Sequence, residues 1–162
     1  MSLCAPAESL RRPRVGFLGT GHIGLMRMRS LVEHGLVVPA AVCDPSADMA
    51  AAAGELAGDA VVAASLEALL EADLDGVVIA TPSALHASQS IAALERGLAV
   101  FCQKPLGRTE DEVRAVIAAA RRADRLLGVD LSYRHTAGMR AIRELARQGE
   151  LGEIFAIDLV FH

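Results

Sequence analysis

Short apolar runs recur along the chain, and five of them are continuous rather than alternating with polar residues. A parallel sheet that is covered on both faces has strands of this kind. Stretches with a helical period separate the runs, so we predict an α/β fold, a doubly wound parallel sheet with right-handed crossovers. The expected strands are 14–18, 37–43, 76–80, 98–102 and 126–131, with 59–64 as a further short strand, and the expected helices are 22–35, 46–57, 65–72, 84–96 and 109–124.

The net charge, the lengths of the apolar runs and the spacing of the cysteines exclude several classes of partner. The net charge is −4 and the chain has no long basic tract, so neither nucleic acid nor an anionic membrane surface is an expected partner. No run approaches the roughly 20 apolar residues of a membrane span, and residues 1–14 lack the apolar core of a signal peptide. The cysteines form no C-x-x-C pair, which favours a reducing, cytoplasmic setting and predicts no metal site: Cys4, Cys43 and Cys102.

The pattern changes after residue 132. Residues 136–148 have the period of an amphipathic helix, and the apolar stretch 153–161 predicts a strand at which the chain stops. We therefore expect a tail over 1–13, a dinucleotide-binding domain over 14–132, and over 133–162 the first helix and strand of a truncated α+β domain. The basic run Arg11, Arg12 and Arg14 is expected to be solvated. In the alternative interpretation, the last strand joins the first sheet or pairs with another subunit.

The segment GFLGTGHIG contains the G-x-G-x-x-G pattern over residues 19–24, between a predicted strand and a predicted helix. In that context Gly19 allows the tight turn, Gly21 lets the backbone approach a pyrophosphate, and Gly24 allows close packing of helix on strand. The free N–H groups at the start of the helix favour a bound phosphate. The pattern predicts a dinucleotide site.

Asp44 follows the second predicted strand, twenty residues beyond Gly24. An acid there can accept hydrogen bonds from both hydroxyls of the adenosine ribose, which favours NAD over NADP. No lysine or arginine lies between Arg29 and Arg96 to neutralise a 2′-phosphate. The alternative for Asp44-Pro45-Ser46 is a turn that only caps the next helix.

Two further segments follow predicted strands. Thr81 and Pro82 begin the turn after the predicted strand 76–80, and His86 falls in the first turn of the next helix, where an ordinary surface histidine is the alternative. Lys104, in FCQKPLG, is the only lysine of the chain. A compact lysine ammonium suits contact with a reacting hydroxyl better than the planar guanidinium of arginine.

Taken together, GFLGTGHIG, the Asp44-Pro45 turn, ATPSALH, QKPL, LSYRH and GELGEI resemble the Gfo/Idh/MocA family of NAD(P)-dependent oxidoreductases in order and spacing. The resemblance covers about residues 13–162. It implies hydride transfer between nicotinamide and a sugar, inositol or related polyol, with NAD as cofactor and NADP less favoured. It also implies a homo-oligomer formed through the sheet of the second domain.

The resemblance implies roles for individual residues. Lys104 corresponds to the lysine that contacts the nicotinamide ribose and the substrate oxygen, and it is the expected catalytic residue. The bond between Lys104 and Pro105 is often cis in members of the family. The residues expected to bind the cofactor are Gly19, Thr20, Gly21, His22, Ile23, Gly24, Asp44, Pro45, Thr81, Pro82, His86, Gln103, Lys104 and Arg134.

Two departures from the family pattern leave other functions open. Gln103 stands where the motif usually has glutamate, and the family's acid/base histidine belongs to a second domain that would follow residue 162. A non-catalytic NAD-binding module or sensor, or an inactive truncated product, is therefore the alternative to an oxidoreductase.

Overall fold

The computed structural model describes residues 11–160, so Cys4 and His162 lie outside the described residues. The chain divides into two compact units, Met1–Asp130 and Leu131–His162, which we describe separately. The expected boundary after residue 132 differs from this division by two residues and stays a prediction.

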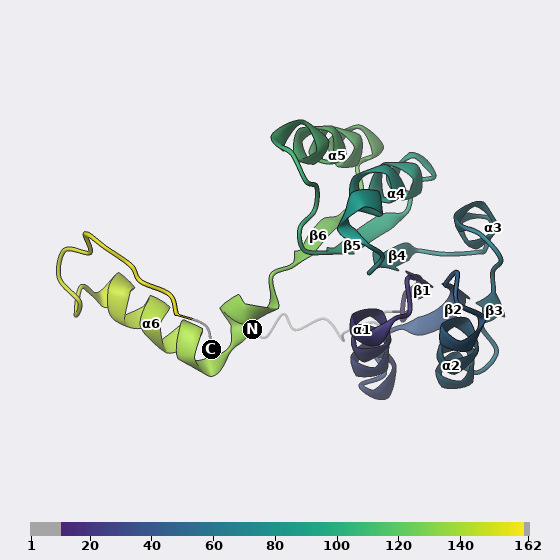
Figure 1. Ribbon diagram of the computed structural model, residues 1–162, viewed down its shortest axis with the longest axis horizontal. Helices are drawn as coiled ribbons and strands as arrows, with labels where there is room; N and C mark the ends of the chain where they lie inside the picture. The colour runs from purple at the N-terminus through teal and green to yellow at the C-terminus, as the bar shows by residue number, and fades with distance from the viewer. Residues whose placement is uncertain (1–10, 161–162) are drawn as a thin grey trace, which may run out of the picture. The chain divides into compact units, whose positions relative to one another are not determined.

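The first unit alternates strands and helices along the chain, as expected (Figure 1). The strands form one sheet in the order β3-β2-β1-β4-β5-β6, and every neighbouring pair is parallel. The order reverses between β1 and β4, which is where ligands bind in doubly wound sheets. The elements are β1 Arg14–Leu18, α1 His22–Glu33, β2 Val38–Cys43, α2 Ala47–Ala57, β3 Val61–Val62, α3 Leu66–Leu70, β4 Gly76–Ile79, α4 Ser83–Glu95, β5 Ala99–Gln103, α5 Glu110–Ala123 and β6 Leu127–Asp130.

Both faces of this sheet carry a buried apolar cluster, which explains the continuous apolar runs. Phe17 and Val42 pack with Met28 of α1 and Ala53 of α2 on one face. On the other face, a second cluster joins side chains of α3, α4 and α5 to the sheet. Figure 1 shows α1 and α2 on one side of the strands and α4 and α5 on the other. The doubly wound prediction is confirmed.

Two helices, α3 and α5, begin at the short polar side chains expected to cap them. Ser65 accepts a hydrogen bond from the backbone N–H of Ala68, and Thr109 accepts one from that of Glu112. Each contact satisfies one N–H group that has no partner within its helix. The two predicted caps are confirmed.

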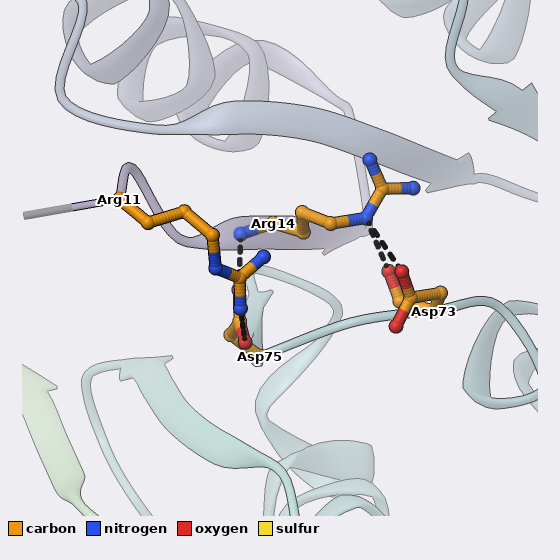
Figure 2. Close-up of polar contacts among 4 residues, drawn as sticks. All are labelled: Arg11, Arg14, Asp73 and Asp75. Atoms are coloured by element: carbon orange, nitrogen blue, oxygen red, sulfur yellow. Dashed lines mark hydrogen bonds and ion pairs between the residues drawn. The ribbon is translucent and has the colours of Figure 1, made fainter.

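Arg11 and Arg14 keep exposed side chains, as expected, but they also bind acids of the loop before β4, which the sequence did not predict (Figure 2). Arg11 Nη2 lies 2.6 Å from Asp75 Oδ1, and Arg14 Nε lies 3.1 Å from Asp73 Oδ2. The backbone N–H of Arg14 also donates to Asp75 Oδ2 at 2.6 Å. These contacts depend on the pairing of β1 with β4, which brings residues some sixty positions apart together.

In the second unit, η1 Ser132–His135 precedes α6 Ala137–Gln148, the predicted amphipathic helix. The strand expected over 153–161 is wrong for the residues that the structure describes, because 153–160 carry no strand. A strand needs a neighbour for its backbone hydrogen bonds, and the described residues of the second unit contain no other strand. Within residues 11–160, no helix has both the length and the hydropathy to cross a membrane.

Candidate functional site

The turn between β1 and α1 leaves room beside its backbone for a ligand. Gly19 has a φ of +81°, and a methyl group added to it would lie 2.7 Å from the backbone of Ala80 after β4. A methyl group on Gly24 would lie 2.0 Å from the carbonyl oxygen of Gly19. In contrast, a methyl group on Gly21 would meet no protein atom of the described residues within 4 Å.

The first turn of α1 is free to face an anion. Gly21 is its N-cap, no side chain among the described residues caps it, and it contains no acidic residue. Its dipole and its N–H groups therefore favour a phosphate, and the open space beside Gly21 gives such a group access. This cradle fits the pyrophosphate of a dinucleotide, with His22 and Ile23 exposed at its rim.

Asp44 lies at the carboxyl end of β2 and holds the glycine turn in place. Its Oδ2 accepts a hydrogen bond from the backbone N–H of Thr20 at 2.7 Å, and its Oδ1 accepts one from that of Ser46 at 2.9 Å. Thr20 is fully buried, and its hydroxyl donates to the carbonyl of Met49 in α2. A carboxylate can accept about four hydrogen bonds, so Asp44 retains capacity for ribose hydroxyls.

His86 is buried, with 1% of its surface exposed, so the surface alternative is wrong. Its Nε2 lies 2.7 Å from the carbonyl oxygen of Thr81, and its Nδ1 lies 2.6 Å from that of Pro105. The ring thus joins the turn after β4 to the loop after β5. The hydroxyl of Thr81 donates to Gln89 within α4 at 2.5 Å, while Pro82 is exposed as the N-cap of that helix.

Lys104 lies directly after β5 and is exposed. Its backbone N–H donates to Oε1 of Gln103 at 2.9 Å. The peptide bond to Pro105 is cis, as the resemblance implied. Because β5 is the neighbour of β4, and β4 of β1, the lysine, Thr81 and the glycine turn follow three adjacent strands at one edge of the sheet.

The roles of two further expected residues, Pro45 and Arg134, stay predictions. Pro45 is exposed in the turn after β2. Arg134 lies on η1 in the second unit, so its role at the site stays a prediction.

Sequence reasoning missed two residues of the site, Asp130 and Arg27. Asp130 ends β6, is 5% exposed, and accepts hydrogen bonds from both Gln103 and Arg27 of α1. An acid at the end of the apolar run LLGVDL was the available signal, because a buried carboxylate requires partners. Its partners follow only from the pairing of β5 with β6.

The two described cysteines are unsuited to chemistry at neutral pH. Burial raises the pKa of the Cys102 thiol to about 11. Burial, and then the charge of Asp44, raise the pKa of Cys43. A thiol with a raised pKa is a poor nucleophile. Among the described residues, no group of three or more His, Cys, Asp and Glu could hold a metal ion.

Comparison with known proteins agrees with this geometry. Residues 13–131 match the model of the oxidoreductase family with an NAD-binding Rossmann fold. The chain is 37% identical over 143 residues to inositol 2-dehydrogenase 3 of Saccharopolyspora erythraea, and 33% identical over 151 residues to the rhizopine catabolism protein MocA of Rhizobium meliloti. These alignments cover 86% and 92% of the chain but 42% and 47% of the relatives, so the chain spans less than half of their lengths.

A solved structure gives the same result for the fold. The WlbA dehydrogenase of Bordetella pertussis, crystallised with NADH and UDP-GlcNAcA, superposes with a TM-score of 0.85 at 27% sequence identity. The match covers 91% of this chain and 43% of that one.

Proposed function

The chain belongs to the Gfo/Idh/MocA oxidoreductase family, and we propose that it forms the cofactor-binding part of a NAD-dependent dehydrogenase for a sugar, inositol or related polyol. The observation that carries the proposal is the common sheet edge on which the glycine turn, Thr81 and Lys104 follow three adjacent strands. A phosphate cradle and an exposed ammonium on one edge serve both a dinucleotide and a hydroxylated substrate.

In this proposal each side chain has a task that its contacts permit. The cradle at Gly21 and the first turn of α1 bind the pyrophosphate, and Asp44 binds the adenosine ribose while excluding a 2′-phosphate by its charge. Lys104 donates a hydrogen bond to the oxygen of the reacting carbon. That hydrogen bond orients the hydroxyl and stabilises negative charge on its oxygen as the proton leaves.

The bound cofactor would supply hydride transfer, which no side chain of the chain can perform. The relatives' names support a polyol or sugar derivative as substrate, since they include an inositol dehydrogenase and a dehydrogenase crystallised with a nucleotide sugar. A cytoplasmic setting, homo-oligomers formed through a second domain, and a place for Arg134 at the nicotinamide belong to the same proposal. A non-catalytic NAD-binding module is less favoured, because a cofactor sensor has no need for the exposed lysine.

The proposal is tested by NAD⁺ reduction in the full-length protein with a panel of inositols, sugars and nucleotide sugars. Lys104→Met, compared with wild type, should bind NADH with similar affinity and lose at least about a hundredfold in turnover, a typical loss for a group acting in proton transfer. Arg108→Met, beside the same loop but paired with Glu112, is the matched control and should keep its turnover. Full turnover by Lys104→Met would contradict the assigned role.

A further inference from the structure

Asp130 is a buried carboxylate on β6 that accepts a hydrogen bond from Gln103 on the adjacent strand β5. In the parallel pairing of β5 with β6, Asp130 lies opposite Gln103. Nε2 of Gln103 donates to Asp130 Oδ2 at 2.9 Å, and Nε of Arg27, on α1, donates to the same oxygen. The charge of the carboxylate is thus balanced by a guanidinium, as a buried acid requires.

The second polar atom of Gln103 reaches the lysine. Its Oε1 accepts the hydrogen bond of the Lys104 backbone N–H at 2.9 Å. One amide group therefore joins Asp130 on one side to the backbone of Lys104 on the other. This contact fixes the orientation of the amide as well, since only its NH₂ group can donate to the carboxylate.

We infer that Asp130 is a positioning residue for Lys104, acting through Gln103, and that its carboxylate supplies the negative charge beside the start of the Lys104 segment. Arg27 donates a hydrogen bond to Asp130, and Asp130 accepts one from the amide of Gln103. The amide oxygen of Gln103 accepts the backbone N–H of Lys104, so the three contacts form one chain. An amide at residue 103 is then required because Asp130 needs a hydrogen-bond donor there. The inference rests on the proposed function only for the task of Lys104.

The same contacts explain why glutamate does not fit at residue 103. A glutamate there would place a second carboxylate oxygen where Nε2 now donates, 2.9 Å from Asp130 Oδ2. Two carboxylates at that distance repel each other, and no hydrogen would lie between them. One acid and one amide satisfy the pair, and either strand can carry the acid provided that the guanidinium of Arg27 donates to the residue that carries it.

The experiment is a charge swap between the two strands, made with substitutions that keep side-chain shape. Gln103→Glu creates the acid pair, and Gln103→Glu combined with Asp130→Asn exchanges the carboxylate and the amide between the two strands. Because Lys104 is the only lysine, its acylation rate can be measured by peptide mass spectrometry with the α-amine as internal reference. This rate needs neither cofactor nor substrate, so it separates a failure of the inference from a failure of the proposed function.

We expect Gln103→Glu to impair the site, although it introduces the glutamate that the resemblance leads one to expect at this position. Gln103→Glu should change the acylation rate of Lys104 by about threefold or more and weaken NADH binding by about tenfold, as coupled neighbours do. The swapped variant should return both values to within about twofold of wild type. Gln148→Glu, on α6, places the same change beside another acid, Glu144, and should leave both values unchanged.

Two results would overturn the inference. One is a Gln103→Glu variant that equals wild type in both measurements. The other is a swapped variant in which neither the acylation rate of Lys104 nor the affinity for NADH returns toward wild type, whether the variant folds or not. Thermal unfolding is measured for every variant. If Gln103→Glu alone fails to fold, the swapped variant decides: recovery of the fold together with the Lys104 acylation rate supports the inference, and recovery of the fold without that rate contradicts it.

Discussion

The carboxylate of Asp44 accepts a hydrogen bond from the backbone N–H of Thr20 at 2.7 Å, so the end of β2 holds the glycine turn that follows β1. One side chain thus shapes the phosphate cradle and offers an acceptor for the ribose hydroxyls. The two tasks predict different responses to loss of its charge.

Asp44→Asn should weaken NADH binding by about tenfold, because hydrogen bonds to a charged group contribute roughly 1.5–3 kcal/mol. NADPH binding should weaken less, since its 2′-phosphate no longer meets a carboxylate. The ratio of the two dissociation constants, measured by calorimetry, checks this. Asp48→Asn, an exposed acid in the first turn of α2, is the control and should leave the ratio unchanged.

Substitution by alanine should affect stability at one glycine of this turn, Gly24, and NADH binding at another, Gly21. Gly24→Ala places a methyl group 2.0 Å from the Gly19 carbonyl oxygen and should lower the free energy of unfolding by more than about 2 kcal/mol. Gly21→Ala meets open space and should leave that free energy within about 0.5 kcal/mol while weakening NADH binding. Urea unfolding and NADH titration separate the two effects, and equal stabilities would contradict the packing argument.

His86→Leu should destabilise the chain by about 2–4 kcal/mol, because the carbonyls of Thr81 and Pro105 lose their partner at a buried site. His34→Leu is the matched control. Its ring contacts a single carbonyl, that of Ser30, and is exposed, so the change should stay below about 1 kcal/mol. Urea unfolding of the two variants gives the comparison, and similar losses would show that the buried contacts contribute little.

Asp75 should stabilise the fold at neutral pH and lose this effect in acid. The hydrogen bond from the backbone N–H of Arg14, and then the charge of Arg11, lower the pKa of Asp75 below its ordinary value. A group whose pKa is lowered by folding stabilises the folded state above its unfolded pKa, and the effect is lost as the pH falls through the folded pKa. Because the side chain is 36% exposed, the contribution should stay below about 1 kcal/mol.

The measurement for Asp75 is urea unfolding of Asp75→Asn and wild type across a range of pH. The two curves should differ at neutral pH and converge in acid. Asp59→Asn, an exposed acid before β3, should follow wild type throughout. A difference that persists unchanged in acid would contradict the assignment to the charge of Asp75.

Local patterns predicted the parts of the fold that depend on neighbours in sequence. The bounds of β1, the caps at Ser65 and Thr109, and the glycine turn all follow from residues within a few positions of each other. Contacts across strands were not predictable in this way. The burial of His86 depends on Pro105, and the role of Asp130 depends on the register of β5 with β6.

The one wrong element has a related cause. The apolar stretch 153–161 has the composition of a strand, but a strand forms only against a partner, and composition does not provide one. In the described part of that stretch no strand is present. The same dependence on pairing explains why the sequence did not predict the ion pairs of Arg11 and Arg14 with acids beside the neighbouring strand.

Titration of the chain with NADH, followed by the same titration with NADPH, tests the account most directly. We predict saturable, equimolar binding of NADH, with NADPH bound at least about tenfold more weakly because Asp44 faces its 2′-phosphate. Addition of NADH should also slow acylation of Lys104, the only lysine, because the cofactor covers it. A folded chain that binds no NADH, or binds NADPH as tightly, would contradict the account.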